Sequence, residues 1–172
     1  MDNSELKPGL TVQDVKDQAI EYRIAKIRIS NLVPHEGILD WHLKEIKDWI
    51  EKDGFQERPI AVSSLRSVGT EWAERFMIHD GHHRTRALKD LGCSFIMCSV
   101  FDYSNPKIKV LDYDTASKPI SKEVVIRKAV SGKDIVPRYD KHFIELADGK
   151  LVPFHDNSII EPKLPTLLDE LE

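Results

Sequence analysis

Residues 77–93, MIHDGHHRTRALKDLGC, place a carboxylate, histidines, arginines and a glycine within one short segment. The spacing predicts a strand, a sharp turn at Gly81 and a helix that begins directly after the turn. The first N–H groups of a helix carry roughly half a positive charge, and a glycine before them lets an anion approach the backbone. Arg84 adds a planar donor fork for phosphate oxygens, and His83 adds a further donor. The predicted phosphate-binding cradle consists of Gly81, His82, His83 and Arg84.

The same residue types also fit an ordinary helix cap or a metal site. Asp80 could serve only as the N-cap of the helix, with the histidines and Arg84 in ordinary surface roles, and spacing alone does not separate this from the cradle. A transition-metal site at this run of histidines is less favoured, because neighbours in a strand point to opposite faces and neighbours on a helix diverge by roughly 100°. Magnesium that arrives with a nucleotide, held by Asp80 and phosphate oxygens, fits the residue types better.

Hydrophobic periodicity predicts the elements that would position this segment. Residues 25–30, AKIRIS, alternate apolar and charged side chains as in a half-buried strand. Leucine or isoleucine at positions 39, 43, 46 and 50 follows the spacing of a helix, which Gly54 would end. Further strands are predicted at residues 58–64, 75–80 and 94–103, and a second helix at residues 82–91. This order indicates an α/β or α+β domain with helices and a mixed sheet.

Two regions flank the core, which is predicted at residues 22–103. Residues 1–21 predict an N-terminal lead with a weak amphipathic helix. Residues 104–172 follow without a linker rich in Gly or Ser, so we expect them to pack on the core as an extension that contributes to the site. Within this extension the patterns predict a helix at 121–130, a hairpin that turns at Asp148 and Gly149, and a last helical turn at 166–172.

Composition restricts the class of protein. The 172 residues carry a formal net charge of −4, so no overall basic field favours nucleic acid or an anionic membrane. The first residues are acidic and polar, unlike a signal peptide, and no apolar run approaches the ~20 residues of a membrane span. Cys93 and Cys98 are expected as small buried thiols. We therefore expect a cytoplasmic protein with neither a membrane nor nucleic acid as its partner.

The segment DGHHRTRAL, followed by Gly92, resembles the phosphate-binding box of the ParB/sulfiredoxin-like fold. Sulfiredoxins carry a catalytic cysteine directly before the His-Arg pair, where this chain has His82. ParB proteins continue with a helix-turn-helix region, whereas the downstream region here shows a hairpin pattern and prolines. The free L-serine kinases of this superfamily are similar over most of the chain, in the segments VPHEGILDWHLKEI, IHDGHHRTRAL, VLDYDTAS and VPRYDKHF. The resemblance implies their fold, a mixed sheet with helices.

The same resemblance implies roles for individual residues. Glu36 would take or orient the proton of the serine hydroxyl, although a glutamate at such a place is more often a partner of a helix dipole. Asp80 would polarise that hydroxyl or hold magnesium, and His35 would orient Glu36 or contact a phosphate. The cradle residues would bind the nucleotide phosphates. The substrate pocket would include Tyr113, Lys141 and His142, where Lys141 replaces a family arginine and Tyr113 a family tryptophan.

The expected function is that of a cytoplasmic free serine kinase. It would transfer the terminal phosphate of ATP or ADP, with Mg²⁺, to the hydroxyl of L-serine and release O-phospho-L-serine. The alternative is a ParB-like nucleotide-binding regulator, or a DNA-associated protein without kinase activity, which would need neither Glu36 nor an amino-acid pocket. A monomer or a small homo-oligomer is expected.

Overall fold

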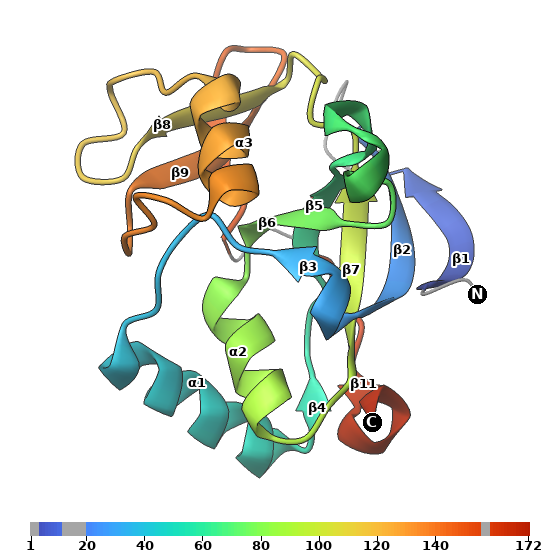
Figure 1. The fold of residues 1–172 in the computed structure, drawn as a ribbon. Helices are drawn as coiled ribbons and strands as arrows, with labels where there is room; N and C mark the ends of the chain where they lie inside the picture. The colour runs from blue at the N-terminus through green and yellow to red at the C-terminus, as the bar shows by residue number, and fades with distance from the viewer. Residues whose placement is uncertain (1–3, 12–19, 156–158) are drawn as a thin grey trace.

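A computed structural model describes the backbone of residues 4–11 and all of residues 20–155 and 159–172. Its centre is a six-stranded sheet in the order β1-β2-β7-β5-β6-β3 (Figure 1). The pairs β5–β7 and β3–β6 are parallel and the others antiparallel, so the sheet is mixed. The strands are β1 (Ser4–Thr11), β2 (Glu21–Arg28), β3 (Leu32–Val33), β5 (Ile60–Ser64), β6 (Phe76–Asp80) and β7 (Phe95–Phe101).

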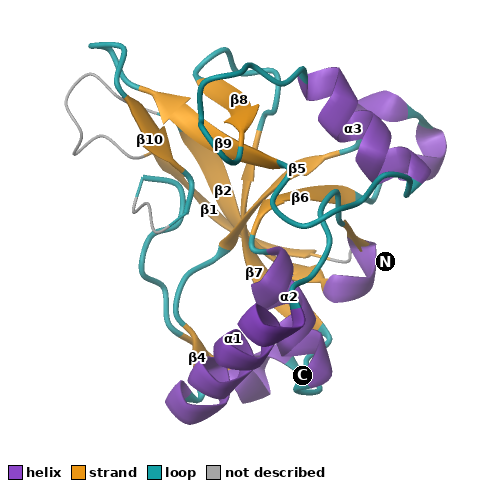
Figure 2. Ribbon diagram, turned by 90° about the vertical axis from the view of Figure 1, so that its left-hand side faces the viewer, coloured by secondary structure: helices purple, strands orange, loops and turns teal. Residues whose placement is uncertain are grey.

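Two helices pack against each other at one end of this sheet, as Figures 1 and 2 show from two directions. They are α1 (Asp40–Asp53) and α2 (His82–Asp90). The apolar stripe of α1 turns inward, with Ile50 buried, and the helix ends at Gly54 in the left-handed conformation, with φ of 78°. Since α2 follows β6 after the single residue Gly81, the carboxyl end of β6 and the start of α2 lie together.

The C-terminal part supplies a second, antiparallel sheet in the order β10-β9-β8 and the helix α3 (Lys122–Ser131). Its strands are β8 (Ile108–Asp112), β9 (Asp140–Glu145) and β10 (Leu151–Pro153). A two-stranded pairing joins β11 (Thr166–Leu167) to β4 (Phe55–Gln56). Four 3₁₀ turns complete the described elements: η1 (Ile29–Asn31), η2 (Arg66–Val68), η3 (Thr70–Trp72) and η4 (Leu168–Leu171). Phe154, Ile160 and Leu171 belong to the same buried cluster as the central strands.

Most predicted elements are confirmed, among them both core helices, the strands around them and the hairpin at Gly149. The N-terminal lead is a correction, because residues 4–11 form β1, which pairs with β2 and extends the sheet. Most of the helix predicted at residues 11–20 lies outside the described residues. Cys93 and Cys98 are free and buried, as expected. No helix in the described part of the chain is long and apolar enough to cross a membrane.

Candidate active site

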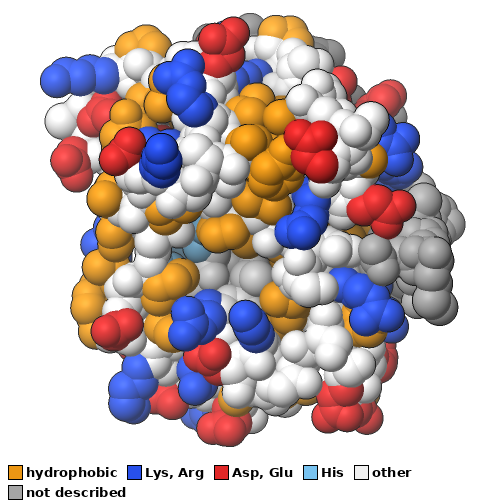
Figure 3. Space-filling model, in the orientation of Figure 1, with side chains coloured by type: hydrophobic (Ala, Val, Ile, Leu, Met, Phe, Trp, Pro, Cys, Tyr) orange, Lys and Arg blue, Asp and Glu red, His pale blue; other side chains and the backbone are white. Residues whose placement is uncertain are grey.

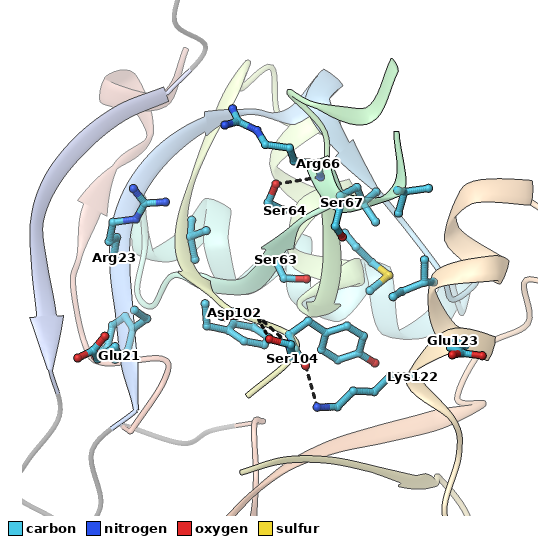
Figure 4. A pocket seen from close by; sticks show the side chains of 18 residues that line it. Glu21, Arg23, Ser63, Ser64, Arg66, Ser67, Asp102, Ser104, Lys122 and Glu123 are labelled. Carbon is cyan, nitrogen blue, oxygen red and sulfur yellow. Dashed lines mark hydrogen bonds between the residues drawn. The ribbon is translucent and has the colours of Figure 1, made fainter. Parts of the chain in front are cut away.

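The described residues enclose two cavities that matter for function. The larger, of about 1120 Å³, lies beside β2, β5, β7 and α3, and its lining is rich in apolar and serine side chains (Figure 4). The smaller, of about 270 Å³, lies where β6 ends and α2 begins, opposite β9. A histidine is visible at the bottom of a hollow on the face shown in Figure 3. Titratable side chains concentrate in the smaller cavity, so we assign the candidate active site there.

Nine of the ten residues that the sequence assigns to the site line this smaller cavity. They are Glu36, Asp80, Gly81, His82, His83, Arg84, Tyr113, Lys141 and His142. His35 is the exception, since it is completely buried behind Glu36. The structure therefore brings together residues from four separate segments of the chain, while their individual roles stay predictions.

Gly81 shapes the start of α2. It is the N-cap residue, with φ of 109°, and no side chain caps the helix. The interpretation of Asp80 as the N-cap is therefore wrong. A Cβ at position 81 would lie 2.3 Å from the Cγ2 atom of Ile60, so only glycine fits between the turn and β5. The first residues of α2 line the cavity, and the first N–H groups of a helix have no partner within the helix, as an anion site requires.

We expect Gly81→Ala to destabilise the protein by about 1–3 kcal/mol more than Gly92→Ala. Gly92 has a similar φ of 93° at the other end of α2, but a Cβ there would meet nothing within 4 Å. Both variants carry the cost of a left-handed alanine, and only the first adds the collision with Ile60. Urea unfolding of the two variants measures the difference, and equal losses would show that the close contact is not needed.

His82 and His83 hold the loop that precedes α1. The His35 N–H donates to His82 Nε2 over 3.1 Å, and the Leu39 N–H donates to His83 Nε2 over 3.0 Å. Both rings therefore accept through Nε2, and burial lowers the pKa of each, that of His83 to about 4. The two histidines are neutral near pH 7. Each ring could therefore donate a hydrogen bond to a phosphate in the cradle, but neither ring would add a positive charge there.

Arg84 links two carboxylates at the base of the cradle. Its Nη2 donates to Asp80 Oδ2 over 3.0 Å and to Glu161 Oε1 over 2.8 Å. Burial would raise the pKa of Asp80, but the Arg84 charge outweighs it, so this pKa lies below its usual value. Burial raises the pKa of Glu161 well above its usual range, and Arg84 opposes this only in part. Asp80 is thus ionised near pH 7, and Arg84 ties it to the C-terminal segment.

His35 lies between two carboxylates. Its Nδ1 lies 2.7 Å from the Ile78 carbonyl oxygen, which can only accept, so this nitrogen carries a proton. Its Nε2 lies 3.0 Å from Asp140 Oδ1 and 3.5 Å from Glu36 Oε1. Burial alone would lower the pKa of His35, but the two carboxylates raise it to about 9. His35 is therefore charged near pH 7 unless another cation replaces its proton.

The carboxylates on either side of His35 differ. Burial raises the pKa of Glu36 to about 6, with the nearby Asp140 adding to the effect and His35 opposing it. Burial would also raise the pKa of Asp140, but its close contact with His35 lowers it to about 2. Asp140 is thus the permanent anion of the pair. Glu36, 17% exposed to the cavity, has the pKa expected of a general base that works near neutral pH.

A second row of buried polar groups lies behind Asp140. His142 Nδ1 is 3.5 Å from Asp140 Oδ1, and His142 Nε2 is 3.0 Å from Tyr103 Oη and 3.1 Å from His79 Nδ1. His79 Nε2 in turn lies 2.6 Å from Ser63 Oγ. Burial lowers the pKa of both histidines, that of His142 to about 3, so both rings are neutral near pH 7. Ser63 lies at the wall of the larger cavity (Figure 4), so this row connects the two cavities.

Cationic side chains surround the mouth of the smaller cavity. The Arg138 guanidinium lies 5.4 Å from the ring centre of Trp41 and 5.5 Å from that of Tyr113. The Lys141 ammonium lies 5.7 Å from the Tyr113 ring centre. Both distances to Tyr113 are within the range of cation–π contacts, which hold the cations over the ring. An anionic group of a substrate would find two positive charges at this mouth.

The charged residues of the site that the sequence did not predict include Arg138 and Asp140, which line the cavity, and Glu161, which binds Arg84. Asp140 and His142 occupy alternate positions in β9 and so share one face of the strand, which is the signal that would have found Asp140. Arg138 lies two residues before Asp140, in the segment that carries Lys141. No local pattern marks Glu161, because it reaches Arg84 across 77 positions of the chain.

Curated relatives of the chain are L-serine kinases, whereas no protein-family model matches it. The chain is 36% identical over 105 residues to an ATP-dependent L-serine kinase of Desulfurococcus mucosus, a match covering 59% of the chain and 39% of the relative. An ATP-dependent L-serine kinase of Staphylothermus marinus is 28% identical over 118 residues, which cover 64% and 45%. The ADP-dependent L-serine kinase SerK of Thermococcus kodakarensis is 24% identical over 123 residues, which cover 72% and 48%. The chain thus spans less than half the length of these relatives.

A solved structure extends the similarity to the fold. Free serine kinase, in a mutant form in complex with ADP, matches 93% of this chain and 98% of its own with a TM-score of 0.68, at 13% sequence identity. At 13% identity the match shows similarity of fold only. The mixed α/β architecture expected from the sequence is confirmed. The described chain therefore has the fold of a solved free serine kinase, and its sequence is similar to those of curated L-serine kinases.

Proposed function

We propose that this protein is a small-molecule kinase that transfers the terminal phosphate of ATP or ADP to the hydroxyl of free L-serine, giving O-phospho-L-serine. The observation that carries the proposal is that a carboxylate with a raised pKa and an anion-binding helix start share one small cavity. Burial raises the pKa of Glu36 to about 6, and the uncapped start of α2 lies on the same cavity wall. The similarity to curated L-serine kinases supports the choice of acceptor.

The roles follow from what phosphoryl transfer requires. Such a reaction needs a group that orients the attacking hydroxyl and positive or hydrogen-bonding groups around the phosphoryl that moves. Glu36 would accept the hydroxyl proton of serine, and Asp80 would complete the acidic side of the site. The N–H groups at Gly81, His82 and His83 would hold the phosphates, with Arg84 beneath them. The carboxylate of the amino acid would face the cations at the cavity mouth, Lys141 and Arg138, beside Tyr113 and His142.

Magnesium would enter with the nucleotide. The Arg84 charge holds the pKa of Asp80 below its usual value, and the ionised carboxylate lines the cavity beside the start of α2. One carboxylate oxygen together with phosphate oxygens and water is an ordinary arrangement for Mg²⁺ beside a nucleotide. Asp80 therefore fits a magnesium ion held mainly by phosphate. The ion would neutralise negative charge on the phosphates as the phosphoryl group moves.

Phosphate transfer to free serine tests the proposal directly. The purified chain is incubated with L-serine and Mg²⁺, with ATP and ADP in separate reactions, and O-phospho-L-serine is followed by ³¹P NMR and mass spectrometry. We expect O-phospho-L-serine with at least one of the two donors, in an amount that rises with the concentration of L-serine. Nucleotide binding to the chain without phosphoserine from either donor would contradict the kinase and favour a nucleotide-binding regulator.

A further inference from the structure

His35, Asp140 and His142 place three potential metal ligands around one point. The ligand atoms of these three buried side chains all lie within 4.8 Å of one another. Asp140 Oδ1 is 3.0 Å from His35 Nε2 and 3.5 Å from His142 Nδ1. Ligands of a tetrahedral ion with bonds of about 2.0–2.1 Å lie about 3.3 Å apart, so two of these separations already match such a site.

The cluster also contains two buried atoms that need a partner. Among the residues that the structure describes, His142 Nδ1 and Asp140 Oδ2 have no hydrogen-bond partner. Each residue is only 3% exposed, and both line the smaller cavity. A buried polar atom without a partner costs free energy comparable to a lost hydrogen bond, so such atoms call for an explanation. A cation bound by His142 Nδ1 and the Asp140 carboxylate would give that nitrogen a partner.

The contacts behind the cluster are those that orient metal-binding histidines. A histidine that binds a metal through one nitrogen usually donates a hydrogen bond from the other. His35 does so through Nδ1, which donates to the Ile78 carbonyl and leaves Nε2 to face Asp140. His142 faces Tyr103 and His79 through Nε2, which leaves Nδ1 toward Asp140. The two rings therefore direct their remaining nitrogens toward the same carboxylate.

From this geometry we propose that His35, Asp140 and His142 bind one divalent transition-metal ion at the floor of the cavity. Two imidazoles and one carboxylate suit Zn²⁺, Fe²⁺ or Co²⁺, whereas Mg²⁺ prefers oxygen ligands. Three protein ligands leave an open position, as in metal sites that meet substrate. Glu36 lies beside the cluster, with its Oε1 at 3.5 Å from His35 Nε2. The site is separate from the magnesium that would accompany the nucleotide at Asp80, and it does not depend on the kinase proposal.

Metal binding measured on the whole chain tests the site. The chain is stripped with a chelator and titrated with Zn²⁺ by calorimetry, and the bound metal is counted by mass spectrometry after dialysis. We expect one Zn²⁺ per chain, because the three ligand atoms lie around a single point. Co²⁺ should give the strong visible absorption of a four- or five-coordinate ion, and excess Mg²⁺ should not displace either metal.

Two variants and one matched control locate the ion. Asp140→Asn and His142→Gln should each weaken Zn²⁺ binding by at least ~10²-fold, with folding checked by circular dichroism. His42→Ala removes another histidine of the same cavity that lies outside the cluster, and should leave Zn²⁺ affinity unchanged. Failure of the wild type to bind stoichiometric Zn²⁺ overturns the inference, as does full binding by both cluster variants. Phosphoserine formation by metal-stripped chain with Mg²⁺ would leave the kinase proposal standing whatever the Zn²⁺ result.

Discussion

Glu36→Gln should lower kcat for phosphate transfer to L-serine by about 10²–10⁴-fold, the usual contribution of a positioned general base. Glutamine keeps the shape of the side chain but cannot accept the hydroxyl proton. The nucleotide KM should change little, because the phosphates would be held at the start of α2 and not by Glu36. Steady-state kinetics with L-serine and nucleotide varied in turn measure both quantities.

The pH profile gives this prediction a second readout. The pKa of Glu36 is raised to about 6, and only the ionised form can accept a proton. The wild-type rate should therefore be full above this pH and fall about tenfold for each pH unit below it, while the residual rate of the variant should lack this acidic limb. Glu51→Gln, at an exposed position on α1, is the matched control and should behave as wild type. A loss of less than about threefold in Glu36→Gln would remove Glu36 from the chemistry.

Arg84→Met should destabilise the protein by about 1–3 kcal/mol, the cost of leaving buried carboxyl oxygens without their hydrogen-bond donor. The guanidinium donates to Glu161, which is 1% exposed, and to Asp80 at the end of β6. Methionine keeps much of the apolar stem but none of these donors. The loss should appear as a lower urea midpoint with little change in the slope of the transition.

Arg86→Met is the matched control for this change. Arg86 donates to Asp90 over 3.1 Å on the same helix, at the same spacing of four residues, but its side chain is 54% exposed. An exposed pair of this kind contributes about 0–1 kcal/mol, so the control should unfold nearly as wild type. Adding Glu161→Leu to Arg84→Met should recover part of the loss by removing the unpaired carboxyl. Equal stability of the two single variants would show that the buried contact between Arg84 and Glu161 does not stabilise the protein.

The sequence by itself determined the local elements and one wall of the site. Helix α1 follows from its apolar spacing and its end at Gly54, and the turn at Gly81 with the start of α2 follows from residues adjacent in the chain. Such features are predictable because helix and strand periodicities depend on neighbours only a few positions apart. The cradle residues needed no distant partner to be recognised, since they are consecutive.

Only the tertiary structure decided what faces that wall. Asp140 meets His35 across 105 positions, and Glu161 meets Arg84 across 77, and no spacing rule connects residues so far apart. The N-terminal strand β1 likewise depends on its antiparallel pairing with β2. The residue pattern of β1 alone does not predict this pairing. The raised pKa of Glu36 follows from the same long-range packing, because it needs burial and the nearby Asp140. Local patterns place side chains on a face, whereas the packing of distant segments sets their charge, their partners and therefore their chemistry.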